Sequence, residues 1–207
     1  MDGAYNGFTM IELIVTLGIF GIIFSIALPS MRDFVLDYRI SSNVNEFLAA
    51  NQLARSEAIK RGRPVSLCIA GTQEEDPDAC CFHTKLTIDD MIACNAPEPG
   101  DLEYTKWPWE SGWLVIADEH GKQKRILSRQ SSLNKRTADD TPERMTVVTT
   151  EPYLVYSSTG RLVAQTCSPN PKFYFQCNKN HGRRVCFDKT GRSRVVLQTS
   201  AATPSCA

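Results

Sequence analysis

A single carboxylate, Glu12, stands inside the most apolar stretch of the chain. Residues 8–28 contain no other charged side chain. As a helix with a rise of about 1.5 Å per residue they would span roughly 30 Å, the thickness of a bilayer core. An unpaired carboxylate in such a segment costs on the order of 3 kcal/mol to insert. We therefore expect Glu12 to have a functional role.

Two arginines near the C-terminus suggest a second kind of chemistry. In Gly191-Arg192-Ser193-Arg194 the arginines are two positions apart, so on an extended strand both would point to one face, about 7 Å from each other. Guanidinium groups bind phosphates bidentately, and this spacing suits successive phosphates. Four further cations could widen the patch, namely Arg183, Arg184, Lys189 and Lys179. Alternatively, exposed arginines on an edge strand serve only to discourage aggregation.

Catalysis and metal binding have no support in the sequence. The chain lacks Gly-x-Ser-x-Gly, His-Glu-x-x-His and P-loop patterns. Its three histidines, His83, His120 and His181, are far apart, and no cysteines have Cys-x-x-Cys spacing. We expect a protein that is not an enzyme and that uses no metal or other cofactor.

Eight cysteines are many for a chain of 207 residues. An even count of this kind indicates an oxidising compartment such as the periplasm, with the cysteines joined in disulfides. Many pairings are possible, and sequence spacing does not select one of them. The candidates are Cys68, Cys80, Cys81, Cys94, Cys167, Cys177, Cys186 and Cys206.

The apolar stretch continues into an amphipathic pattern. From residue 30 to residue 61 apolar side chains recur at helical spacing, and Gly62 can take the left-handed conformation that ends a helix. Pro29 removes one backbone hydrogen bond and should kink or loosen the helix. The pattern predicts one helix over residues 8–61. We expect its later large side chains to be buried against the chain's own β-domain, namely Phe34, Tyr38, Phe47 and Leu48.

Short extended runs separated by turn residues follow the helix. The predicted strands are residues 65–70, 113–118, 123–127, 145–150, 153–157, 172–177, 183–187 and 193–198. Residues 188–191 should form a hairpin turn with Gly191 at positive φ, and residues 158–160 a similar turn. Net charge is zero, but residues 73–103 carry nine acids and one base. Residues 71–110, which contain these acids, are interpreted as a long surface loop. The polar residues 129–144 are interpreted as a second loop.

The N-terminus resembles that of type IV prepilins and type II secretion pseudopilins. The motif is Gly7-Phe8-Thr9-Met10-Ile11-Glu12-Leu13. The resemblance implies that a prepilin peptidase cuts after Gly7 and methylates the new N-terminus at Phe8. It also implies that Glu12 supports assembly by pairing with the ammonium of a neighbouring subunit, and that Pro29 bends the helix. Two other readings are a capping box formed by Thr9 and Glu12, and an ordinary secretory signal cleaved near residues 25–27.

Later segments resemble the GspH/FimT group of minor pilins and pseudopilins, at residues 52–61, 111–115 and 185–192. The resemblance implies an α+β, type IV pilin-like fold. A long N-terminal helix, first transmembrane and then amphipathic, would pack on an antiparallel β-sheet domain with disulfides. Residues 1–7 would be a leader peptide, residues 8–61 the helix and residues 62–207 the periplasmic β-domain.

The same resemblance implies a structural function. The expected role is a minor pilin at the initiation point or tip of a type IV pilus, anchored by a single pass in the bacterial inner membrane. Its partners would be the prepilin peptidase and other minor and major pilins or pseudopilins. Residues 191–194 match a Gly-Arg-x-Arg element of DNA-capturing members, which implies double-stranded DNA binding for natural transformation. The alternative is a GspH-like minor pseudopilin of a type II protein secretion system.

Overall fold

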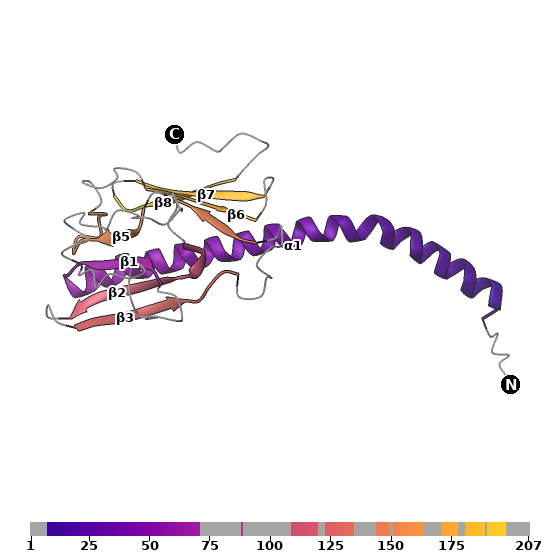
Figure 1. The fold of residues 1–207 in the computed structure, drawn as a ribbon, viewed down its shortest axis with the longest axis horizontal. Coiled ribbons are helices and arrows are strands. Elements are labelled where there is room, and N and C mark those ends of the chain that lie inside the picture. Colours follow the sequence, from indigo (N-terminus) through magenta and orange to yellow (C-terminus); the bar gives the residue numbers. More distant parts are fainter. Residues whose placement is uncertain are drawn as a thin grey trace, which may run out of the picture. The chain divides into compact units, whose positions relative to one another are not determined.

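A computed structural model describes residues 8–70, 88, 109–119, 123–134, 144–149, 151–163, 171–177, 181–188 and 190–197. Within these ranges, the side chains of residues 26–30, 118–119 and 123–124 lie outside the description. The chain divides into two compact units, Met1–Tyr38 and Arg39–Ala207. Helix α1, Met10–Arg61, has residues in both units (Figure 1).

Both ends of α1 are capped. At the N-terminus the Thr9 hydroxyl accepts a hydrogen bond of 3.3 Å from the Glu12 N–H, which satisfies one of the first backbone donors. At the C-terminus Gly62 has a φ of 62°. The Gly62 N–H donates to the Ile59 carbonyl and the Arg63 N–H to the Ala58 carbonyl, which is the Schellman arrangement. Glycine therefore ends the helix at Arg61.

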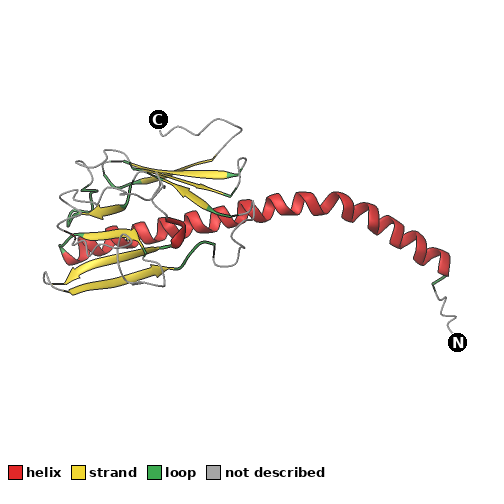
Figure 2. Ribbon diagram, viewed as in Figure 1, coloured by secondary structure: helices red, strands yellow, loops and turns green. Residues whose placement is uncertain are grey.

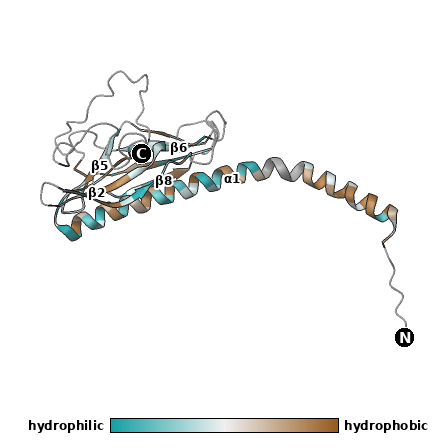
Figure 3. Ribbon diagram, turned by 60° about the horizontal axis from the view of Figure 1, so that its bottom comes forward, coloured by the Kyte–Doolittle hydropathy of each residue, from teal (hydrophilic) through white to brown (hydrophobic). Residues whose placement is uncertain are grey.

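In the first unit, the described side chains of the helix are exposed on every side up to residue 25. Figure 3 shows this end of α1 as mainly hydrophobic. Among the residues described, we find no helix with both the length and the apolar character needed to cross a membrane. Residues 26–28 of the predicted apolar segment, and Pro29, have side chains outside the description.

Two of the predicted core residues of the helix are exposed. Phe34 and Tyr38 are 69% and 67% exposed, so the expectation that they are buried is wrong for this chain. In the second unit the helix is fully buried at Ile40, Val44, Phe47, Asn51, Ala54 and Ala58, which recur at three- and four-residue intervals typical of one helix face. Phe34 and Tyr38 precede this stripe. Phe47 is buried and Leu48 half-buried, as predicted.

The second unit contains two antiparallel sheets (Figure 2). The first sheet has the order β3-β2-β1-β5, formed by Gln123–Gln130, Trp113–Glu119, Val65–Ile69 and Tyr153–Tyr156. The second has the order β4-β6-β7-β8, formed by Thr146–Val148, Lys172–Gln176, Gly182–Phe187 and Ser193–Leu197. A short 3-10 helix, Trp109–Ser111, precedes β2.

One helix residue, Phe47, joins the helix to both sheets. Its ring lies 5.4 Å from Trp113 of β2 and 4.9 Å from Phe173 of β6, between ring centroids. It also contacts Trp109, Phe175 and Phe187 at 5.3 to 6.2 Å. Aromatic pairs at these separations add about 0.5–1.5 kcal/mol each beyond the area they bury. An aromatic cluster around Phe47 therefore forms the part of the core between the helix and the two sheets.

The sequence predicts this architecture closely. All eight predicted strands are present, with ends that differ by at most three residues. The α+β fold, with a long helix on antiparallel sheets, is confirmed. The predicted hairpin between residues 187 and 193 is also present, because β7 pairs with β8 and Gly191 has a φ of 78°. Most of the predicted loop 71–110 and residues 135–143 of the second loop lie outside the described residues.

Candidate functional site

Three strands place cationic side chains on one face of the second sheet. Lys172 of β6 pairs with Cys186 of β7, and Cys186 pairs with Arg194 of β8. Direct partners in antiparallel strands point to the same face, so Lys172 and Arg194 flank Cys186. The next row on that face contains Tyr174 and Arg184, whose guanidinium carbon lies 5.5 Å from the centre of the Tyr174 ring.

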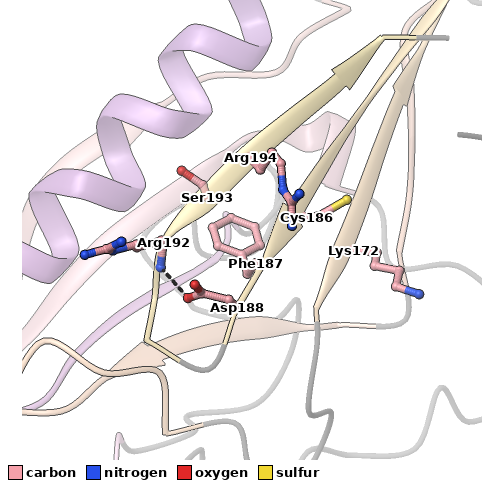
Figure 4. A pocket seen from close by; sticks show the side chains of 7 residues that line it. All are labelled: Lys172, Cys186, Phe187, Asp188, Arg192, Ser193 and Arg194. Carbon is pink, nitrogen blue, oxygen red and sulfur yellow. Dashed lines mark hydrogen bonds between the residues drawn. The ribbon is translucent and has the colours of Figure 1, made fainter. Parts of the chain in front are cut away.

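A pocket of about 380 Å³ opens at the row formed by Lys172, Cys186 and Arg194, at the end of the β7–β8 hairpin. It contains three cationic side chains and one carboxylate, which gives it a net positive charge (Figure 4). An anion is therefore the kind of ligand that this pocket favours. The lining residues are Lys172, Cys186, Phe187, Asp188, Arg192, Ser193 and Arg194.

The carboxylate in the pocket, Asp188, organises the turn. One of its oxygens, Oδ1, accepts hydrogen bonds from the Thr190 N–H at 2.9 Å, the Thr190 hydroxyl at 2.7 Å and the Arg192 N–H at 2.9 Å. The bond from the Thr190 hydroxyl is the main reason that the pKa of Asp188 lies below its ordinary value. Asp188 therefore stays ionised at neutral pH, and it fixes the backbone from which Arg192 projects.

The two arginines of the predicted pair point in different directions. In Figure 4 Arg194 points toward Cys186, whereas the guanidinium of Arg192 extends to the opposite side. The expectation of one shared face was based on strand alternation, but β8 begins only at Ser193. Arg192 still belongs to the turn, where alternation does not apply. Both arginines are exposed and both line the pocket.

The other predicted cations are divided between the two faces of the sheet. Arg184 and Arg194 share a face, because Arg184 lies two residues from Cys186 on β7. Arg183 pairs with Phe175 and Leu197 and so points to the other face. Lys179 and Lys189 lie outside the described residues. Lys172 was not among the residues predicted for the arginine patch, since only the strand register brings it next to Arg194.

At the N-terminus the structure describes part of the predicted processing site. Phe8 is 82% exposed, and Glu12 is exposed in the first turn of α1. Gly7 lies outside the described residues, as does the Pro29 side chain. The hydrogen bond from the Glu12 N–H to Thr9 uses the backbone of Glu12 and leaves its carboxylate available.

The cysteines differ in part from the expectation that all are paired. Cys68 and Cys186 are each part of a disulfide. Cys177 is instead a buried thiol, whose sulfur lies 3.8 Å from the Met145 sulfur, so its assignment to a disulfide is wrong in this structure. Apolar packing at this position favours an inert thiol. The other five lie outside the described residues, namely Cys80, Cys81, Cys94, Cys167 and Cys206.

No cluster of three or more His, Cys, Asp or Glu side chains suited to a metal ion occurs within the described part of the chain.

Comparisons with known proteins identify two family matches and one curated relative. A family described as Type II transport protein GspH matches residues 43–191, and the prokaryotic N-terminal methylation motif matches residues 3–28. Fimbrial protein Q of Moraxella bovis is 36% identical over 73 residues, which cover 35% of this chain and 46% of that protein. The chain thus spans about half the length of that curated relative.

Two solved structures are also similar, both of the type IV minor pilin FimU of Pseudomonas aeruginosa. One is 20% identical with a TM-score of 0.49 and covers 84% of this chain and 99% of FimU. The second crystal form is 18% identical with a TM-score of 0.46 and covers 81% and 99%.

The GspH match covers more than half of the chain, which therefore belongs to the Type II transport protein GspH family and carries the N-terminal methylation motif, as minor type IV pilins and pseudopilins do.

Proposed function

We propose that this chain is a minor type IV pilin that is anchored in the inner membrane before it assembles. A prepilin peptidase cuts after Gly7 and methylates Phe8, and the mature helix then packs among those of other pilins. The observation that carries this proposal is the exposure of the first helical segment. Its large apolar side chains are 52% to 85% exposed over residues 8–24, so an external apolar environment must cover them.

Lipid and neighbouring helices are the two environments that fit this segment. In lipid the charge of Glu12 is costly. After cleavage, Phe8 carries an ammonium group, and the carboxylate of Glu12 in a neighbouring subunit can neutralise it. Pairing of the two charges favours the filament over the isolated chain in the membrane.

Replacement of Glu12 tests this role. Glu12→Gln keeps the size of the side chain and removes its charge, so we expect normal cleavage after Gly7 but a loss of at least tenfold in the amount found in sheared filaments. The measurement is quantitative immunoblotting of the membrane and filament fractions.

A matched variant separates charge pairing from helix capping. Thr9→Val removes the hydroxyl that accepts the Glu12 N–H and keeps the carboxylate. If Thr9→Val fails to assemble while Glu12→Gln assembles normally, capping explains the motif and the charge-pairing account is wrong.

A second candidate is a minor pseudopilin of a type II secretion system. The observation that favours it is the description of the matched family as a type II transport protein. The pilus is preferred because the curated relative is a fimbrial protein. Cross-linking in cells distinguishes them, since the chain should be joined to pilins in one case and to pseudopilins in the other.

The cationic pocket supports a finer proposal, that the domain binds double-stranded DNA for uptake. Lys172, Arg192 and Arg194 line the pocket with only Asp188 opposing them, and that carboxylate already accepts three hydrogen bonds within the turn. Contacts from such side chains to phosphates are independent of sequence and weaken steeply as salt increases.

A salt titration tests DNA binding. The full chain in non-ionic detergent would be titrated against a fluorescent 20-base-pair duplex, beside an Arg192→Gln/Arg194→Gln variant. We expect micromolar binding in the parent and a loss of at least tenfold in the variant, with a smaller salt slope. Absence of parental binding at low salt would refute DNA binding and leave the assembly proposal untouched.

A further inference from the structure

Two turns, one beside each sheet, have the same pattern of backbone hydrogen bonds. One follows β5 at residues 157–161, and the other follows β7 at residues 188–192, where Lys189 lies outside the description. In the first, the Gly160 N–H donates to the Ser157 carbonyl at 2.8 Å, and the Ser157 N–H donates to the Arg161 carbonyl at 2.8 Å. In the second, Gly191 donates to Asp188 at 3.0 Å, and Asp188 donates to Arg192 at 3.0 Å. We call these two segments the glycine turns.

The side chains of the glycine turns repeat this correspondence. The hydroxyls of Ser157 and Thr159 lie 2.9 Å apart, and the Ser157 hydroxyl accepts from the Arg161 N–H at 3.3 Å. The Asp188 carboxylate takes the place of the Ser157 hydroxyl in the second turn. Gly160 and Gly191 have φ values of 73° and 78°, which favour glycine over other residues. Each turn therefore presents an arginine at the same position, directly after its glycine.

The glycine turns are in contact with each other and with the end of α1. A Cβ atom on Gly191 would lie 3.1 Å from the Gly160 carbonyl oxygen and 2.8 Å from the Tyr156 ring. A Cβ atom on Gly160 would lie 2.6 Å from Ile59 and 3.3 Å from the Arg55 Nε atom. Only glycine allows this close approach, and the approach brings Arg55 of α1 to the same place.

The pKa of Tyr156 provides independent support for this grouping. Burial raises the pKa of its hydroxyl, and the charges of Arg55 and Asp188 both act on the same group. Arg55 from α1 and Asp188 from the second turn therefore lie near one buried phenol. Three arginines from three elements, Arg55, Arg161 and Arg192, gather here, and the latter two are exposed.

We propose that the paired glycine turns form one phosphate-binding surface, on which Arg161 and Arg192 contact the backbone of double-stranded DNA with Arg55 beside them. This inference rests on the proposed DNA-binding function and extends it from the second sheet to the first. The direction of Arg192, which points away from Arg194 in Figure 4, agrees with a surface centred on the turns. Contacts from both sheets would lengthen the path of the duplex across the domain.

The test compares single arginine variants of the full chain in detergent, each of which removes one positive charge. The variants are Arg161→Gln, Arg192→Gln and the control Arg129→Gln. Arg129 is an exposed residue of β3, at the opposite edge of the first sheet from β5. We expect the first two to weaken binding of a 20-base-pair duplex by about three- to tenfold and to lower the salt slope by about one. The control should change binding less than twofold.

Three results would overturn the inference. If Arg161→Gln behaves like Arg129→Gln while Arg192→Gln loses binding, the DNA surface is confined to the β7–β8 hairpin and DNA binding itself stands. If the parent binds no duplex at low salt, both the inference and the DNA-binding function fail. If all three variants weaken binding equally, only overall charge matters and the glycine turns are not a site. Equal melting temperatures would establish that the variants are folded.

Discussion

At the scale of single residues, Asp188 determines the geometry of the candidate site. Its Oδ1 atom accepts three hydrogen bonds that close the turn before β8, and one of them holds the backbone of Arg192. A carboxylate that accepts bonds in the folded state alone has a lowered pKa and contributes stability above its unfolded pKa. The turn should therefore weaken in acid.

The variant Asp188→Ala tests this contribution. At pH 7 we expect it to lower the free energy of unfolding by about 1 kcal/mol, because the three donors lose their acceptor. The folded pKa is lowered, so the contribution is present above about pH 4 and disappears as pH falls through the folded pKa. Urea unfolding at pH 7 and at pH 2.5 should therefore show a smaller difference between parent and variant in acid.

Asp188→Asn provides the control for that experiment. It retains an oxygen acceptor and cannot ionise, so its difference from Asp188→Ala should be the same at both pH values. A parent-to-alanine difference that does not change with pH would contradict the role assigned to the charge.

At the scale of elements, the sequence predicts the helix and strands because their signals are local. The apolar period of residues 40–58 and Gly62 define the buried face and end of α1, and turn residues mark each strand. The site is less predictable because it depends on register and contact. Lys172 is next to Arg194 only through the pairing across β7. The turn that carries Arg161 lies against the turn that carries Arg192 only because Gly160 and Gly191 approach each other in the folded domain. The placement of Arg192 differed from expectation because strand alternation begins one residue later.

A buried polar pair, Tyr156 and Asn51, joins the helix to the first sheet in addition to the packing of Phe47. The Tyr156 hydroxyl donates to the Asn51 side-chain oxygen at 2.5 Å, and both residues are 1% exposed or less. A buried acceptor that loses its donor costs about 1–3 kcal/mol. This bond lies beside the glycine turns, since Tyr156 contacts Gly191.

Tyr156→Phe should therefore lower the free energy of unfolding by about 1–3 kcal/mol in urea denaturation. In the double variant with Asn51→Ala the acceptor is absent as well, so the two changes should cost less together than the sum of their separate costs. Strict additivity in this cycle would show that the bond contributes nothing to helix docking.

At the scale of the whole molecule, the two compact units differ in how their apolar side chains are covered. Residues 39–207 contain an aromatic core between helix and sheets, together with an anion-favouring pocket. The side chains of residues 8–25 are exposed, and their one carboxylate, Glu12, lies within the N-terminal methylation motif. In the filament that we propose, neighbouring helices would cover these apolar side chains, and the domain of the second unit would carry the pocket. Membership of the GspH family agrees with this division of roles.

The most direct test of this account is the mass of the N-terminal peptide of the chain in sheared, purified filaments. The account predicts that the chain is present there and begins at Phe8 with an added methyl group, whereas a Gly7→Leu variant remains in the membrane fraction with residues 1–7 attached. Filaments without the chain, or a chain that still carries residues 1–7 in every fraction, would contradict its assignment as a pilus subunit.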